Sequence, residues 1–211
     1  MTNKKKTILI VSVFFLLTVL YKCIVSNIDF SFATYYQSKA DITASEEEIV
    51  CQKDGIISDE LCQIAETELN KIPTSFKEEF LKSGWHIYIT DENLAKEYFN
   101  GEHTKVHGCT FYEKRLILIE NNENAVKTAT IHEFGHWADN YYGNISKTQE
   151  FKNIYKQEYL EFEQVFLRDC KMDITEYFAE GFYYYVKNPD ALKKIAPKTY
   201  LVYENLEKTE N

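Results

Sequence analysis

Two histidines four residues apart, with a glutamate directly after the first, constrain this chain more than any other feature. His132, Glu133 and His136 stand in a stretch whose apolar residues recur at helical spacing, which predicts a helix over 125–141. On an α-helix, residues four apart share one face and lie about 5.4 Å apart along the axis. The spacing therefore predicts that both imidazoles project from one side of a single helix.

Such a pair of imidazoles is suited to zinc. Neutral imidazole nitrogens are common zinc ligands, and a catalytic zinc combines three protein ligands with one open position. Glu133 is turned by about 100° from His132 on a helix of 3.6 residues per turn, so its carboxylate can lie beside the metal without binding it. There it can take a proton from a water that the metal makes more acidic. We expect one zinc ion per chain, with His132 and His136 as ligands and Glu133 as general base.

The same five-residue pattern can occur by chance on an exposed helix, and its surroundings argue against that alternative. A buried strand is predicted shortly before the helix, at residues 115–120. Gly135 lies inside the helix, where glycine costs about 1 kcal/mol relative to alanine. A glycine kept at that cost indicates close packing against another element.

A third ligand must come from farther along the chain. Glu176 and Glu180 lie on another predicted helix, forty residues beyond His136, and share one face of it. One carboxylate can bind the metal while the other accepts a hydrogen bond from a ligand histidine. The spacing from Asp173 to Glu176 is also that of a capping box, so a purely structural role is the alternative. Downstream of the histidine pair, we favour the ligand interpretation.

The first 27 residues differ from the rest of the chain. Lys4–Lys6 precede an apolar run over Ile8–Leu20, the form of a secretory signal or a signal anchor. No small-residue cleavage site follows, so removal and retention both stay open, and a buried core helix is the less favoured alternative. We expect an export segment at 1–27, a stalk or linker at 28–50 and a folded domain at 51–211.

The net charge of the chain restricts the classes of partner that it can bind. The chain has 33 acidic and 24 basic residues and a net charge of −9, and its N-terminal segment is basic, so the body is strongly acidic. An acidic body does not bind nucleic acid through phosphate neutralisation. We expect a protein that is secreted or anchored to the outer face of the cell membrane, with membrane contact through the N-terminal segment if that segment is not cleaved.

Four cysteines lie outside the export segment: Cys51, Cys62, Cys109 and Cys170. An even number in an exported chain permits two disulfides, and the preferred pairs are Cys51 with Cys62 and Cys109 with Cys170. Zinc binding by these residues is disfavoured because they form no C-x-x-C pair. Free buried thiols are the remaining alternative.

Strand patterns occupy the first half of the chain and helix patterns the second, which predicts an α+β domain. Alternation predicts a strand over 85–90, and a run of four apolar residues predicts a buried one over 116–119. Residues 102–113 are polar and predict turns. The predicted helix N-caps are Ser58, Ser75, Asn124, Ser146 and Asp173.

Three blocks stand out together: residues 132–136 with Asp139, residues 176–180, and residues 196–200. They resemble the catalytic domain of anthrax lethal factor, and equally the small secreted Pro-Pro endopeptidases of Gram-positive bacteria. The resemblance extends over about residues 51–205. It implies a zincin-like metalloprotease domain with a small mixed sheet, an active-site helix and a helical C-terminal half.

The resemblance also implies roles for individual residues. The implied metal ligands are His132, His136 and Glu176, and the general base agrees with the one inferred above. Glu180 and Asp139 are implied to support the ligands. In the family, the segment before the strand at 115–120 lines the substrate groove and pairs with an extended peptide. This implies substrate contacts at Gly108, Cys109 and Thr110.

One departure from the family concerns Asp169. The family usually has a tyrosine seven residues before the third ligand, where its hydroxyl helps to stabilise the oxyanion of the transition state. Here that position is Asp169, whose negative charge would repel an oxyanion. Tyr155 and Tyr159, on the preceding predicted helix, are the candidates to serve instead.

The sequence thus predicts an exported zinc endopeptidase that hydrolyses extended peptide or protein substrates, and the resemblance points to proline-containing sites. The alternative is a non-catalytic zinc-binding surface or toxin-like protein, in which Asp169 marks lost activity. Glu133 argues against it, because metal binding alone would not need that residue. A structural membrane-anchored protein with an accidental pattern is the weakest interpretation.

Overall fold

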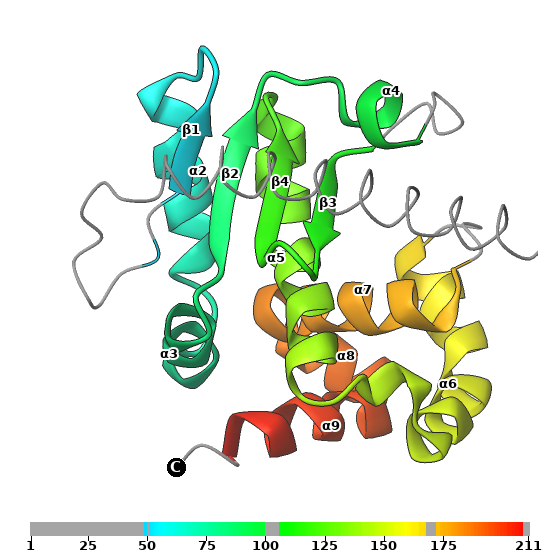
Figure 1. Cartoon of the computed structure of the whole chain (residues 1–211). Coiled ribbons are helices and arrows are strands. Elements are labelled where there is room, and N and C mark those ends of the chain that lie inside the picture. The colour runs from blue at the N-terminus through cyan, green and yellow to red at the C-terminus, as the bar shows by residue number, and fades with distance from the viewer. Residues whose placement is uncertain (1–48, 50, 100–105, 168–171, 209–211) are drawn as a thin grey trace, which may run out of the picture. The chain divides into compact units, whose positions relative to one another are not determined.

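The computed structural model (Figure 1) describes residues 49, 51–99, 106–167 and 172–208. These residues all belong to one of the two compact units into which the chain divides, residues 44–211. The predicted export segment, Asp169 and Cys170 lie outside the described residues, and the predicted domain boundaries stay predictions. No helix among the described residues combines the length and apolar character needed to cross a membrane.

Four strands form one mixed sheet in the order β1-β2-β4-β3. They are β1 (Cys51–Asp54), β2 (His86–Thr90), β3 (Gly108–Phe111) and β4 (Leu116–Glu120). The first three in that order are mutually parallel, and β3 pairs antiparallel with β4 at the edge of the sheet. The central strands β2 and β4 are almost wholly buried, as runs of apolar residues in parallel strands require.

Helices and the loops between them make up the rest of the described chain. They are α2 (Asp59–Leu69), α3 (Thr74–Lys82), α4 (Leu94–Phe99), α5 (Glu123–Tyr141), α6 (Gln149–Phe162), α7 (Ile174–Lys187), α8 (Pro189–Ile195) and α9 (Pro197–Lys208), with short η1 (Ile145–Lys147) and η2 (Glu163–Leu167). In Figure 1, α6 to α9 gather on one side of the sheet, and α5 runs from behind the sheet into this helical half. The α+β class, the small mixed sheet and the helical C-terminal half are confirmed.

Helix α5 is anchored by the aromatic residues on its inner faces. The ring centroid of Phe134 lies 4.8 Å from that of Phe80 on α3 and 5.9 Å from that of Phe182 on α7. Trp137 lies 5.1 Å from Phe80 and is fully buried. Truncating a buried ring of this kind to alanine typically costs about 3–5 kcal/mol. The same packing leaves the histidine face of α5 turned toward solvent-accessible space.

Local hydrogen bonds decide where several helices begin. The predicted caps at Ser58 and Asp173 are confirmed, while those at Ser75, Asn124 and Ser146 are wrong. Asn122 caps α5 by accepting from Ala125 N–H at 2.8 Å. Thr148 caps α6 by accepting from Phe151 N–H at 3.2 Å. α3 begins after Pro73, which occupies the N-cap position with an extended ψ of 141° and makes no side-chain cap hydrogen bond.

The prediction of turns throughout 102–113 is wrong at residues 108–111, where β3 forms, and is confirmed at 112–113, which form a turn. Four residues were too few to show an alternating pattern, and pairing with β4 supplies the hydrogen bonds that hold them extended. Arg115 turns the chain back into β4 with a φ of 51°. The edge of the sheet therefore faces α5, which contacts both β3 and β4.

Three cysteines are described, and all are free thiols in this structure. Cys51 on β1 and Cys62 on α2 are both buried and lie side by side. The hydrogen bond that Cys51 donates to Cys62, together with burial, raises the pKa of the Cys51 thiol well above its usual range. The predicted bond between these two cysteines is not formed here, although the fold brings them together. The predicted partner of Cys109 lies outside the described residues.

Candidate metal centre and active site

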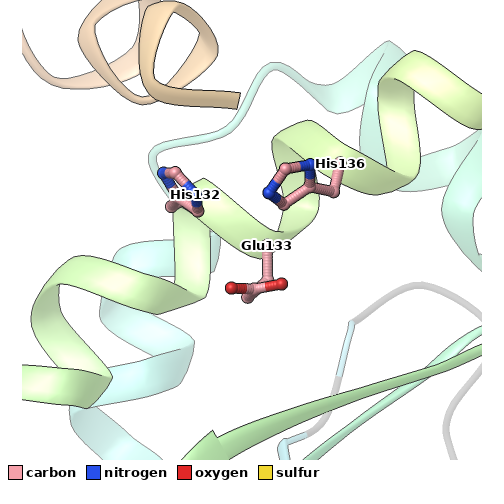
Figure 2. Close-up of side chains that lie close together, drawn as sticks. All are labelled: His132, Glu133 and His136. Carbon is pink, nitrogen blue, oxygen red and sulfur yellow. The ribbon is translucent and has the colours of Figure 1, made fainter. Parts of the chain in front are cut away.

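One helix presents the histidine pair and the glutamate together. Figure 2 shows His132, Glu133 and His136 leaving α5 as neighbours, with the glutamate at a different angle from the two imidazoles. The possible metal-binding atoms of the three residues all lie within 4.8 Å of one another. The two imidazole rings are 5.0 Å apart at their centroids and are inclined by 79°. The two imidazoles therefore project from one side of α5, as the helical spacing predicted.

Helix α7 brings two carboxylates to the same place. Glu176 lies 3.2 Å from Nε2 of His132 through one oxygen and 3.4 Å from Nε2 of His136 through the other. Glu180 lies 2.9 Å from Nδ1 of His132. One carboxylate thus contacts Nε2 of both histidines, and the other contacts Nδ1 of His132.

The approach of α7 depends on a glycine in α5. A Cβ atom added to Gly135 would come within 2.9 Å of both the Cα and the carbonyl oxygen of Ala179, and within 3.0 Å of the Cβ of Phe182. Backbone atoms cannot move aside as a flexible side chain can, so only glycine permits this spacing. The close packing expected from Gly135 is present, and it sets how near Glu176 stands to the histidines.

Burial and paired charges shift the titration of this cluster. Burial opposes protonation of His132, but hydrogen bonds to Glu176 and Glu180 outweigh it and raise the pKa of His132 to about 10. Burial also opposes ionisation of Glu176, yet the two histidines hold the pKa of that carboxyl well below its ordinary value. The cluster therefore gathers a carboxylate and two imidazole nitrogens around one point.

This donor set fits zinc. Two imidazole nitrogens and one carboxylate are the ligands of a known class of catalytic zinc sites, with a fourth position left open. Glu133 lies near the same point, but its carboxylate is hydrogen-bonded to Thr110 instead of the histidines. Glu176, which contacts both Nε2 atoms, is therefore better placed than Glu133 to be the third ligand. Glu180 is placed to accept from Nδ1 of His132, which would turn Nε2 toward a metal.

These histidines and glutamates form part of the wall of a cleft with a volume of about 980 Å³. The residues that line it include His107, Gly108, Cys109, Thr110, Tyr112, Lys147, Thr175, Tyr183 and Tyr184, together with the histidines and glutamates of the cluster. The three residues expected to contact substrate, Gly108 to Thr110, are thus on the cleft. Burial, and then the charge of Glu133, raise the pKa of Cys109 to about 12, so that its thiol stays protonated at neutral pH and is a poor nucleophile.

Asp139 is buried one turn beyond the histidines, where its carboxylate contacts Ser146. It accepts from the Ser146 backbone N–H at 2.7 Å and from the Ser146 hydroxyl at 2.6 Å. These bonds fix the turn between α5 and η1. They explain why Ser146 does not cap α6, and the support that Asp139 was expected to give to the metal ligands stays a prediction.

Tyr155 and Tyr159, the candidates to replace the tyrosine of the family, are engaged elsewhere. Tyr155 donates to the carbonyl of Met172 at 2.9 Å, and Tyr159 donates to Glu163 at 2.8 Å while accepting from the Met172 N–H. Neither residue lines the cleft. Their hydroxyl groups hold the segment that leads into α7.

Other tyrosines line the cleft, and sequence reasoning missed them. Tyr183 and Tyr184 follow Glu180 on α7, and Tyr112 follows Thr110 at the end of β3. Burial and the nearby charges of Asp139, Glu133 and Glu176 raise the pKa of Tyr112 to about 12. The alternation of a strand through Thr110 is the signal that would have found Tyr112, and it was hidden because the strand itself was not recognised.

With this geometry in place, comparison with known proteins becomes informative. A family model described as anthrax toxin lethal factor, N- and C-terminal domain, matches residues 35–206. None of the curated proteins matches the chain. Among solved structures, the chain is similar to the Pro-Pro endopeptidase PPEP-2 from Paenibacillus alvei.

The likeness to that endopeptidase concerns the fold. The two chains are 23% identical, with a TM-score of 0.59, and the alignment covers 77% of this chain and 100% of the other. The family match extends over most of the chain and includes the histidine pair, Glu176 and Glu180. The resemblance first drawn from three blocks of residues is confirmed: this chain belongs to the anthrax toxin lethal factor family.

Proposed function

We propose that this protein is an exported zinc-dependent endopeptidase. The observation that supports it most is the convergence of Nε2 of His132 and Nε2 of His136 on the carboxylate of Glu176, in the wall of a large cleft. Membership of the lethal factor family supports the same activity, and the similar solved structure is that of an endopeptidase.

In this proposal, His132, His136 and Glu176 hold the zinc ion. Glu180 accepts a hydrogen bond from Nδ1–H of His132, which directs Nε2 toward the metal. When bound, zinc polarises the carbonyl of the scissile bond and makes water a better nucleophile.

Glu133 moves the proton. It is 7% exposed and stands beside the histidine pair, and its carboxylate is turned to β3, where it accepts from the Thr110 hydroxyl. As general base it takes a proton from the attacking water, and it then gives that proton to the nitrogen of the leaving amine. A pure metal-binding protein would need no such group, which favours the enzyme over the non-catalytic alternative.

As substrates we propose extended peptides with proline near the scissile bond. A proline-rich peptide is already extended, so that less conformational entropy is lost when it docks. Aromatic rings on the cleft, those of Tyr112, Tyr183 and Tyr184, suit such a chain. The acidic body adds a preference for substrates with basic residues through its long-range field.

We propose further that residues 1–27 export the protein, so that the domain acts outside the cell, either released or held by this segment in the membrane. The basic start and the apolar run of that segment support the proposal. Cell fractionation with antibody against the folded domain tests it. Recovery of the protein from the cytoplasm alone would contradict export without affecting the proposed activity.

The activity is tested with a randomised peptide library that contains Pro-Pro pairs. The wild-type protein loaded with zinc should cleave it, and the matched variant Glu133→Gln should not. Cleavage clustered at proline supports the substrate proposal, and cleavage elsewhere leaves an endopeptidase of another specificity. A zinc-loaded, folded protein that cleaves nothing would favour the non-catalytic alternative.

A further inference from the structure

Strand β3 holds the side chain of Glu133 by a hydroxyl group. Oγ1 of Thr110 lies 2.7 Å from Oε2 of Glu133 and 3.2 Å from its backbone carbonyl oxygen. A hydroxyl has one proton, and the shorter distance to a charged acceptor favours the carboxylate. Because Glu133 is 7% exposed, this bond takes the place of one that water would otherwise provide.

A glycine on the same strand makes room for this carboxylate. A Cβ atom added to Gly108 would lie 2.6 Å from Cγ, 2.9 Å from Oε1 and 3.0 Å from Cδ of Glu133. The methylene and the carboxyl group therefore rest directly against the backbone of β3. Any larger residue at position 108 would push the Glu133 side chain away from its place.

The sheet fixes both contacts relative to each other. Alternate residues of a strand point to the same face, which puts Gly108 and Thr110 together opposite Glu133. Their partners in β4 are Ile119 and Ile117, which are fully buried. Threonine is branched at Cβ, and its side chain is stiff about the first torsion angle. The hydroxyl is thus held by a paired strand and not by a flexible loop.

From these contacts we propose that Thr110 is a positioning residue for Glu133, an inference that rests on the proposed function. Its hydroxyl holds Oε2 and leaves Oε1 to take the proton of the attacking water. The hydroxide formed attacks the peptide carbonyl carbon, and Oε1 returns the proton to the amine nitrogen as the C–N bond breaks. Gly108 and Thr110 lie on the substrate cleft, but their inner face serves the general base.

Three single variants test the proposal. Thr110→Val keeps the shape and removes the hydroxyl, and it should lower kcat roughly 10- to 100-fold with little change in KM. Thr110→Ser restores the hydroxyl and should recover most of kcat. Gly108→Ala should also lower kcat. Zinc content, measured by elemental analysis, should stay at the wild-type value in all three, which separates a displaced base from a damaged metal site.

Thr90→Val is the matched control. Thr90 is a fully buried threonine on β2 whose hydroxyl donates to the carboxylate of Asp54 at 3.1 Å, and it does not line the cleft. The change removes a hydroxyl–carboxylate bond from the same sheet, together with the bond that this hydroxyl accepts from the Glu92 N–H at 3.2 Å. It should leave kcat unchanged even if it lowers stability, so an equal loss of kcat in Thr90→Val and Thr110→Val would overturn the positioning role.

A double-mutant cycle separates this inference from the proposed function. If Thr110 acts through Glu133, then Thr110→Val should have no further effect on the residual turnover of Glu133→Ala, whereas an independent role would lower it again. The same cycle on unfolding free energies tests the contact without turnover. Additive unfolding effects would overturn the contact. If the wild type is inactive but the effects of the two substitutions on the free energy of unfolding are coupled, the contact is supported. The catalytic use of the contact and the proposed activity are then both overturned.

Discussion

Gly135 of α5 and Ala179 of α7 touch backbone to backbone, with no space for a side chain between them. Ala179 is the residue before Glu180, and Glu176 is three residues earlier, so this contact lies next to both carboxylates of the metal cluster. The distance between the two helices is fixed where it matters most for the proposed ligands.

The variant Gly135→Ala tests that relationship. Alanine should favour the helix by about 1 kcal/mol, but overpacking a tight contact typically costs about 1–3 kcal/mol, and the added methyl should push α7 outward. We expect zinc affinity to fall at least roughly 10-fold, since ligand geometry is lost. Competition with a chromogenic chelator measures it. The control Asn124→Ala, at the exposed start of the same helix, should bind zinc as the wild type does.

The ligand assignment predicts one zinc per chain. His132→Ala, His136→Ala and Glu176→Ala should each lose it, and Glu180→Gln should retain it with affinity weakened by about 10- to 100-fold, because only the orientation of His132 is affected. Elemental analysis after gel filtration reports the content. Full zinc content in Glu176→Ala would mean that the third ligand is misassigned, and Glu180 would become the first alternative.

Glu133 is predicted to serve the reaction and not the metal. Glu133→Ala should keep zinc and the unfolding temperature close to those of the wild type, while turnover falls by about 10²- to 10⁴-fold. Steady-state kinetics on the best peptide of the library provides the measurement. Turnover at the wild-type rate in this variant would falsify the proposed mechanism.

A buried ion pair away from the site predicts how stability depends on pH. Glu68 on α2 contacts Lys187 on α7 at 2.6 Å and Lys71 at 2.7 Å. Burial opposes ionisation of Glu68, but the two ammonium groups outweigh it and lower its pKa below the ordinary 4.5. The pair therefore stabilises the fold above that pH, and the stabilisation is lost as pH falls through the folded-state pKa.

Lys187→Met should accordingly destabilise the domain by roughly 1–3 kcal/mol at pH 7. The difference from the wild type should shrink as pH falls below about 4.5, where Glu68 becomes protonated in both proteins. Urea unfolding at several pH values measures it. Lys208→Met, which removes an exposed partner of Glu204, should leave the unfolding curve almost unchanged. A pH-independent difference for Lys187→Met would show that lost packing, not charge, explains the effect.

Within each helix, the residues of the candidate site could be predicted from the sequence because the period of one helix places them on one face. His132 and His136 needed only the period of one helix, and Glu176 and Glu180 needed the cap at Asp173 and the same period. Gly135 predicted a close contact, because alanine would stabilise that position of the helix more than glycine does. Which element it contacts could not be predicted, because that depends on how α7 returns to α5.

Strand β3, which lies beside the histidine pair, was harder to predict. β3 has only four residues and is held by its bonds to β4, so that local sequence carries almost no signal of it. The hydroxyl of Thr110 and the clearance at Gly108 follow from that strand and were invisible for the same reason. The spacing of Ser146 to Gln149 fits a capping box and so predicts a helix start. In the structure, Ser146 instead donates to the buried carboxylate of Asp139, seven residues earlier in the chain.

The proposed ligands come from two helices separated by a long stretch of chain. His136 and Glu176 are forty residues apart in sequence, and α6 lies between them. An ion held by both would act as a cross-link that closes this loop. In the chain-entropy treatment of cross-links, a loop of that length corresponds to at most about 4 kcal/mol. The metal would thus stabilise the helical half of the domain, and its removal would lower the free energy of unfolding as well as abolish the site.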